Sequence, residues 1–509
     1  MKHLKSLLVL LMICALALPL LCACGDSSDT SVAESTASTG AVADGDTSDD
    51  VSESTDVAPD IIDLNGREIN VICWAWGQNS NSIKGYTGEI MYSEEDNSSR
   101  VDKAKKEVVD YIETTYNCTV NGVFCDNDYV GVIEKMVTTG TYDYDIAFTS
   151  ANQARSMLAK NLLTDLNTVP SLNFENSWWD QNSVADLSIG GRLFYVCGDI
   201  NTYDNLGTWC VLFNKNLKTT LGISDDFYQK AQDGQWTMDY FMEVCKDVTQ
   251  EYDGNSGIDE FDLWACGTET FNIYAHLVGG GIRVAEKDDT DFPYLTVTKS
   301  PETTYNALDK IITFYNSPDV MVANGGKFDG KGYTNVWEST INKAFTEGRE
   351  LFYVCGLINV AGFRDMKDPF GILPMPMLYE GQDRYYHTVS PDNSSYLVLP
   401  YGVPGIEELG VVVEALAMKS QELVTPEFYD MQLKGRDSHD EESWAMLDII
   451  FATRCFDLGV SYNWGSIMGC YYSMDNSDIA SSFDKILSAA QSAIEDTRMD
   501  LEDYEIVLN

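Results

Sequence analysis

The sequence predicts an α/β fold with a parallel or mixed sheet. Between residues 69 and 160, short apolar runs alternate with amphipathic segments, and this β-α-β-α-β order is typical of a sheet with helices on both faces. Hydrophobic residues make up 44% of the chain and aromatic residues 11%, so the chain can bury a large core. At roughly 150 residues per domain, its length corresponds to about three domains or two large lobes.

The charge of the chain excludes several classes of partner. The 33 Lys and Arg residues face 80 Asp and Glu residues, and the formal net charge is −47. A nucleic-acid binder needs a basic surface, and an anionic membrane face would repel this chain, so we expect neither as a partner. The 13 Cys and four His residues show no C-x-x-C or zinc-finger spacing. We therefore expect no bound metal and no cofactor.

Residues 1–23 are predicted to be a lipoprotein signal peptide. Lys2 and Lys5 precede an apolar run over residues 7–21, which is too short for an ordinary transmembrane helix. The run ends in Leu-Cys-Ala-Cys-Gly at 21–25, which resembles the bacterial lipobox and would make Cys24 the lipidated residue. The alternative is a plain secretory peptide that is cleaved near the same place. No other run approaches the length of a membrane span.

Residues 24–59 are predicted to be a disordered acidic tether. The composition over this stretch is dominated by Ser, Thr, Ala, Asp, Glu and Gly, which cannot offset the entropy of ordering the backbone. A flexible tether of this length has an r.m.s. reach of about 30–35 Å. We therefore expect the body of the protein at the extracellular face of a bacterial membrane, lipid-anchored.

The body begins with three strands and three helices in alternation. Strands are predicted at 69–74, 118–124 and 145–149, and helices at 101–116, 129–137 and 153–160. Ligands of such sheets meet the loops beyond the carboxyl ends of the strands, here 74–79 and 150–153. Residues 191–198 and 348–356 have nearly the same sequence, and each predicts a buried strand. A further strand is predicted at 262–266 and a long helix at 483–504.

Several short motifs through the body carry a resemblance to a known family. They are Asp-Tyr-Asp-Ile at 143–146, Trp-Trp-Asp at 178–180, Gly-Asp at 198–199, Phe-Asn-Lys-Asn-Leu at 213–217, Gly-Gln-Trp-Thr-Met-Asp at 234–239, Phe-Thr-Glu-Gly at 345–348 and Gly-Ile-Leu-Pro-Met-Pro at 371–376. In this order behind a lipobox, the set resembles bacterial extracellular solute-binding proteins of family 1, the lipoprotein receptors of sugar-type ABC importers.

The resemblance implies a periplasmic-binding-protein-like (Venus flytrap) fold, in which two α/β lobes flank a cleft and the chain crosses between them several times. It implies an N-lobe of 60–198 plus 336–392 and a C-lobe of 199–335 plus 393–509. The family's Asp-rich loop is degraded here to residues 253–259, where Gly257 interrupts the series of oxygen ligands that calcium needs.

A sugar offers flat C–H faces to aromatic rings and hydroxyl groups to polar side chains. The expected loops and crossings hold side chains of both kinds. The candidate ligand-binding residues are Trp74, Trp76, Ser150, Asn152, Gln153, Tyr203, Asp204, Trp209, Glu269, Phe271, Asn359, Tyr462 and Trp464. Each also has a structural alternative, because aromatic residues of large α/β proteins mostly serve as core or rim packing. Of these candidates we weight Trp74 and Trp464 most, because each lies in a polar, glycine-containing loop.

The sequence favours a receptor over an enzyme. It has no G-x-S-x-G elbow, no H-E-x-x-H and no Walker loop, so we assign no catalytic residue. The alternative is a surface-anchored carbohydrate-active enzyme, similar to glycoside hydrolases, that uses a pair of carboxylates. The receptor hypothesis predicts a monomer that delivers a neutral sugar or oligosaccharide to the permease subunits of an ABC transporter. Most cysteines beyond Cys24 are expected to be buried thiols.

Overall fold

The computed structural model describes residues 56–74, 88–93, 99–125, 127–328, 330–363, 366–433 and 441–507. All of these ranges belong to one compact unit that spans Ser54–Asn509. The predicted signal peptide, most of the predicted tether, Cys24 and Trp76 lie outside the described residues. Within the described part, no helix combines the length and the apolar composition that a membrane crossing requires.

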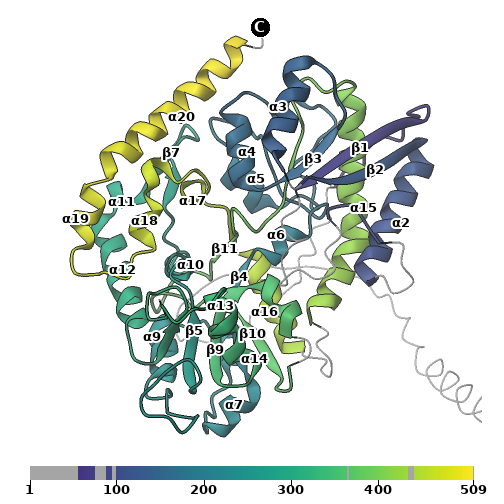
Figure 1. The fold of residues 1–509 in the computed structure, drawn as a ribbon. Coiled ribbons are helices and arrows are strands. Elements are labelled where there is room, and N and C mark those ends of the chain that lie inside the picture. The colour runs from purple at the N-terminus through teal and green to yellow at the C-terminus, as the bar shows by residue number, and fades with distance from the viewer. Residues whose placement is uncertain are drawn as a thin grey trace, which may run out of the picture. The chain divides into compact units, whose positions relative to one another are not determined.

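A four-stranded sheet forms the centre of the first lobe (Figure 1). Its order is β12-β3-β1-β2, with β1 (Arg67–Trp74) parallel to β2 (Cys118–Cys125) and β3 (Ile146–Thr149), and β12 (Tyr396–Val398) antiparallel at the edge. The connections are α2 (Arg100–Tyr116), α3 (Tyr129–Thr139) and α4 (Ala151–Leu158). A capping box starts α2, because Ser99 and Asp102 each bind the other's backbone N–H. The long helix α15 (Ile406–Leu433) packs along α2.

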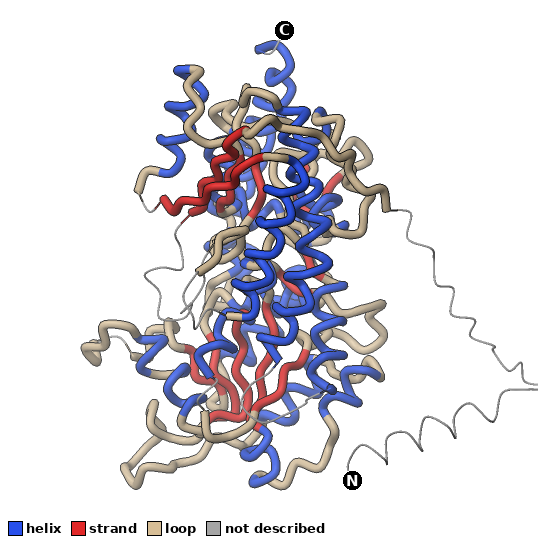
Figure 2. The backbone as a smooth tube through the Cα atoms, turned by 90° about the vertical axis from the view of Figure 1, so that its right-hand side faces the viewer, coloured by secondary structure: helices blue, strands red, loops and turns tan. Residues whose placement is uncertain are grey.

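A five-stranded sheet forms the centre of the second lobe, and Figure 2 shows the two sheets as separate groups of strands. Its order is β10-β4-β9-β5-β8. Strand β5 (Trp264–Thr268) is parallel to β8 (Val320–Val322) and β9 (Glu350–Gly356), while β4 (Trp209–Asn214) is antiparallel to both β9 and β10 (Phe370–Leu373). The helices of this lobe are α7 (Lys215–Thr220), α8 (Phe227–Gln232), α9 (Met238–Cys245), α10 (Asn272–Gly279), α11 (Thr296–Lys299), α12 (Pro301–Tyr315), α13 (Val336–Ser339), α14 (Ile341–Thr346), η3 (Leu357–Phe363) and α16 (Glu441–Ala452).

The remaining elements belong to neither of these two sheets. They are η2 (Leu166–Thr168), α5 (Gln181–Leu187), α6 (Tyr203–Leu206), the hairpin β6 (Ala285–Lys287) and β7 (Pro293–Leu295), the pair β11 (His387–Thr388) and β13 (Arg454–Cys455), α17 (Leu458–Tyr462), η4 (Trp464–Ser466), α18 (Met468–Tyr471), α19 (Ile479–Asp484) and α20 (Leu487–Val507). Helix α19 lies on α12 of the second lobe through the Tyr305 and Phe483 rings, whose centroids are 5.5 Å apart. Helix α20 follows α19, and near its C-terminal end the Tyr504 hydroxyl donates to the Leu163 carbonyl of the first lobe.

The strand pairing corrects the expected lobe boundaries. Residues 336–392 were assigned to the N-lobe, yet β9 and β10 pair with strands of the second sheet. Residues 393–509 were assigned to the C-lobe, yet β12 pairs with β3 and α15 packs on α2. The chain stays in the second lobe near 332–335 and returns to the first lobe after Val389. The apolar strands 350–356 and 396–398 are equally buried, so composition does not reveal which sheet each one joins.

The two similar segments have different structures. Residues 350–356 form β9, while 191–198 make only isolated bridges, among them Val196 with Leu397. The first segment runs beside the short strand β12, which offers too few partners for a continuous ladder. The tail, predicted as one helix over 483–504, is divided into α19 and α20. The prediction of buried thiols is confirmed, because all ten described cysteines are free and most are buried.

Candidate functional site

Four of the predicted ligand residues meet at one edge of the second sheet. The parallel strands β5, β8 and β9 end at this edge, and the antiparallel strand β4 begins there. Glu269 and Phe271 follow the end of β5, and Asn359 follows the end of β9. Trp209 is the first residue of β4 and pairs with Gly356, the last residue of β9. We call this group, together with Asn272, the second-lobe edge.

The rings of the second-lobe edge are held in place by a buried amide. Trp209 and Phe271 are half-buried and meet edge to face, with centroids 5.9 Å apart and ring planes at 90°. The Trp209 Nε1 donates to Asn272 Oδ1 at 2.7 Å, and Asn272 Nδ2 donates to Val354 O at 2.9 Å. Asn272 is buried and fully engaged, so it fixes the indole. Sequence reasoning missed Asn272, although it begins the helix that follows β5.

Glu269 is a half-buried carboxylate on the loop after β5, two residues before Phe271. Burial raises the pKa of Glu269 to about 7. The Asn359 side chain hydrogen-bonds the Cys355 thiol, which also feels the charge of Glu269 and lies opposite Cys210 in the ladder. Glu269, Cys355 and Asn359 are therefore close neighbours at this edge.

The first sheet presents a similar edge at the carboxyl ends of β1 and β3. Trp74 ends β1, is half-buried and packs edge to face on Tyr129 at 5.9 Å between centroids. Ser150 caps α4 by accepting from the Gln153 N–H at 3.3 Å, and the Thr149 hydroxyl donates to Gln153 Oε1 at 2.7 Å. Asn152 donates to Asp392, which lies on the segment that returns from the second lobe.

Tyr203 and Asp204 are placed in the crossing, away from solvent, which corrects their interpretation as ligand residues. Asp204 is 1% exposed, and its carboxylate pairs with Arg454 at 2.9 Å. Arg454 also pairs with Asp180, and its Nη1 donates to Asn205 Oδ1 at 2.5 Å. Burial raises the pKa of Asp204 to about 7, although the Arg454 charge acts to lower it. The local sequence around an unpaired carboxylate in a loop does not differ from that around a paired carboxylate in a crossing, so the sequence could not distinguish the two.

Tyr462 and Trp464 are also packing residues, and the weight given to Trp464 was wrong. The two rings stack with centroids 4.7 Å apart, and Trp464 is only 3% exposed. The Trp464 Nε1 donates to Thr497 Oγ1 of α20 at 2.9 Å. Both residues line a cavity of about 400 Å³ against α4 and α20, which includes no residue of either sheet edge.

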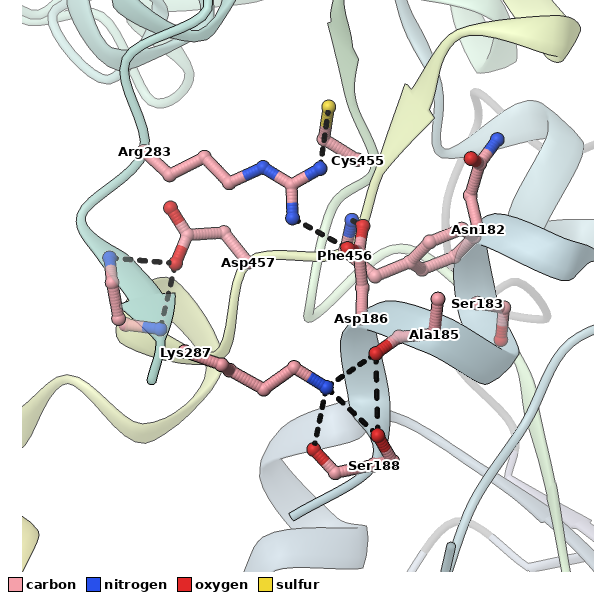
Figure 3. Close-up of polar contacts among 12 residues, drawn as sticks. Asn182, Ser183, Ala185, Asp186, Ser188, Arg283, Lys287, Cys455, Phe456 and Asp457 are labelled. Atoms are coloured by element: carbon pink, nitrogen blue, oxygen red, sulfur yellow. Dashed lines mark hydrogen bonds and ion pairs between the residues drawn. The ribbon is translucent and has the colours of Figure 1, made fainter. Parts of the chain in front are cut away.

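The hairpin β6–β7 clamps α5 through paired charges (Figure 3). Arg283 pairs with Asp186 at 2.5 Å, and Lys287 Nζ donates to Ser188 Oγ at 2.7 Å. The Asp457 carboxylate accepts the Val284 N–H at 2.6 Å. The adjoining cavity of about 250 Å³ is lined by charges that already have partners. A larger hollow of about 1130 Å³ lies between α8, residues 377–385 and α16, apart from both edges.

Three carboxylates lie close together around the degraded Asp-rich loop. Oxygen atoms of Glu251, Asp253 and Asp262 lie within 4.8 Å of one another. The two oxygens of Asp262 accept the backbone N–H groups of Tyr252 and Asp259, each at 2.7 Å. These hydrogen bonds lower the pKa of Asp262 and hold the loop in shape.

Comparison with known proteins identifies the family and the fold. The family model described as "Bacterial extracellular solute-binding protein" matches residues 100–402, more than half of the chain. No curated protein matches the sequence. Among solved structures, Mycobacterium tuberculosis UspC is similar at a TM-score of 0.54 and 12% identity, covering 84% of this chain and 100% of its own. A Rhizobium etli sugar transporter in an open conformation gives a TM-score of 0.54 at 13% identity, covering 84% and 99%.

An ABC substrate-binding protein of Listeria monocytogenes, solved in complex with cycloalternan, gives a TM-score of 0.50 at 12% identity, covering 87% of this chain and 99% of its own. These likenesses confirm the predicted two-lobe α/β fold. The family model covers strands of both sheets. The chain therefore belongs to the bacterial extracellular solute-binding proteins.

Proposed function

We propose that this protein is a lipid-anchored extracellular receptor that binds a carbohydrate between the two sheet edges and delivers it to an ABC transporter permease. The observation that carries the proposal is the Trp209–Phe271 pair, held by Asn272 at the carboxyl edge of the second sheet. Membership of the solute-binding family makes that edge the expected place for a solute.

The chemistry of the edge suits a sugar. Half-buried aromatic rings can cover the apolar face of a pyranose, while carboxylate and amide groups bind its hydroxyls. Glu269 and Asn359 supply such groups on the second lobe. Trp74 and Asn152 supply a ring and an amide on the first lobe. A solute that touched both edges would be covered by rings from two sides.

Two of the segments that cross between the lobes pair with each other and provide a place for the lobes to rotate. Residues 199–208 lead to the second lobe and 389–395 lead back, and the two strands touch where Thr208 bridges Val389. The Ser390 N–H donates to Gly207 O at 2.9 Å, so the crossings move as a pair. Binding between lobes favours closure, because only the closed form contacts the solute from both sides.

The ligands of similar proteins support a carbohydrate. The Listeria protein was solved with cycloalternan, and a cyclo/maltodextrin-binding protein of TM-score 0.51 and 12% identity was solved with maltotetraose. We therefore choose linear and cyclic neutral oligosaccharides as the first probes.

Calorimetry with these oligosaccharides tests the site. Trp209→Ala should weaken binding by about 10- to 100-fold, because a central aromatic anchor is lost. Trp444→Ala is the matched control, since Trp444 is 41% exposed on α16 and should leave affinity unchanged. Small-angle scattering should show contraction on binding, and the recovered sugar should be chemically intact. Turnover of the sugar would contradict the receptor and favour the enzyme. If both variants bind the oligosaccharide with the affinity of the native protein, the second-lobe edge is not part of the binding site.

The anchor has its own test. Cys24→Ala should abolish incorporation of a labelled fatty acid in cells, because no thiol remains to be acylated, while Cys22→Ala should retain it. Retention of the label by Cys24→Ala would show that another residue carries the lipid.

A further inference from the structure

The Glu269 carboxylate has no basic partner in the part of the chain that the structure describes. Its electrostatic neighbours are Tyr353 and Cys355 on β9 and Tyr315 on α12. None of these carries a positive charge, and desolvation alone accounts for its raised pKa. A carboxylate that is half-buried without a counter-charge is costly, since water only partly solvates it. It would be stabilised by a cation that a solute brings.

The aromatic pair of the second-lobe edge adds a second attraction for a cation. Trp209 and Phe271 are both half-buried, so each keeps surface open to a solute. An ammonium group that lies over the face of an aromatic ring is attracted by the ring quadrupole.

The remaining polar groups of this edge do not compete for the carboxylate. Asn272 is engaged with Trp209, Thr268 and Val354, and Asn359 with Cys355. The net charge of −47 makes the approach of a cation favourable over the whole surface.

We propose that the second-lobe edge selects a solute that carries an organic ammonium group, with Glu269 as the charge partner and Trp209 and Phe271 as the aromatic rings of the same edge. Building on the proposed function, this assigns the solute class as an amine-bearing saccharide or a similar small ammonium compound. Glu269 is then the residue that determines specificity.

Ionisation of Glu269 is coupled to binding. Because its pKa is about 7, a fraction of the receptor is protonated near neutral pH. A bound quaternary ammonium such as choline carries its charge at every pH and favours the charged carboxylate, so its binding releases a proton at pH 6.5 and its affinity rises as the pH rises toward 8. Tyr353, Tyr315 and Cys355 have raised pKa values and stay neutral over this range.

The test compares matched ligands and matched variants of the mature protein by calorimetry. The ligands are short glucosamine oligomers, the same oligomers N-acetylated, and choline, so that the arms separate an amino sugar from a quaternary amine. The variants are Glu269→Gln, which keeps the shape and removes the charge, and Glu302→Gln, an exposed acid on α12 that controls for net charge.

We expect the glucosamine oligomers to bind the native protein at pH 6.5 at least tenfold tighter than their acetylated counterparts, and choline binding to release a proton at pH 6.5, seen in buffers of different ionisation enthalpy. Glu269→Gln should abolish both the preference and the proton release, while Glu302→Gln keeps them. Tight binding of acetylated or neutral oligosaccharides, unchanged in Glu269→Gln, would overturn this inference and leave the proposed function intact. Failure of every saccharide and amine to bind would overturn both.

Discussion

Removal of the Arg454 guanidinium should destabilise the crossing between the lobes more than any surface change. Arg454 is the shared partner of Asp180 and Asp204, and the three side chains are 10%, 6% and 1% exposed. Arg454→Met keeps much of the volume and leaves two buried carboxylates unpaired. Breaking a buried pair in this way costs about 3–5 kcal/mol, a large fraction of a typical free energy of unfolding.

The loss should depend on pH in a defined direction. The folded pKa of Asp204 is raised to about 7, so its contribution to stability is full below its ordinary value near 3.8 and is lost as pH rises through 7. Because the Arg454 charge lowers that pKa, Arg454→Met raises it further. The difference in unfolding free energy between the native protein and the variant should therefore be larger at pH 8 than at pH 5.

Urea unfolding at both pH values measures these free energies. Arg498→Met is the control, because Arg498 pairs with Glu502 at the surface of α20 and its loss should cost about 0.5 kcal/mol or less. The double variant Arg454→Met/Asp204→Asn should recover at least about 1 kcal/mol at pH 8, since the orphaned charge is removed. An Arg454→Met deficit that is the same at both pH values, or no recovery in the double variant, would refute the role of the paired charges.

Two further predictions concern buried groups. Glu350 is fully buried against Gly267, and neither of its carboxyl oxygens has a hydrogen-bond partner among the described residues. Burial raises the pKa of Glu350 well above its usual range, so its contribution to stability is lost as pH rises above about 4.5. Glu350→Gln should therefore flatten the pH dependence of the unfolding free energy between pH 5 and 8, and an unchanged slope would contradict this. Trp464→Ala should lower the free energy of unfolding by about 3–5 kcal/mol without changing solute affinity at temperatures where the protein is folded, and a selective loss of affinity would return Trp464 to the site.

The sequence was most informative where a pattern is local. The strand at 69–74 and the helix at 101–116 appear within a few residues of their predicted ends, because apolar period and capping residues act over short distances. Trp178 and Trp179, which belong to one of the family motifs, are buried and donate to Glu414. Glu269 was proposed as a ligand residue because it follows a predicted strand, and Trp209 because it lies just past an expected crossing.

Long-range partners could not be predicted from the sequence. Asp204 and Trp464 were misinterpreted because their partners, Arg454 and Thr497, lie 250 and 33 positions away. The sheet that β12 joins is decided by pairing with β3 and not by its own apolar residues. Asn272 was missed because a buried amide that orients a ring looks like any residue of a first helical turn.

Helix α20 restricts how the lobes can turn. Its 21 residues form a rod of about 32 Å. One end follows α19 on the second lobe, and the other is fastened to the first lobe by Tyr504, whose ring also lies 5.1 Å from Phe194. A rod fixed at both ends keeps the distance between its attachment points constant. Rotation of one lobe against the other is then confined to axes that pass close to α20. A domain fused to the C-terminus would therefore lie near the rotation axis, where the displacement on closure is small.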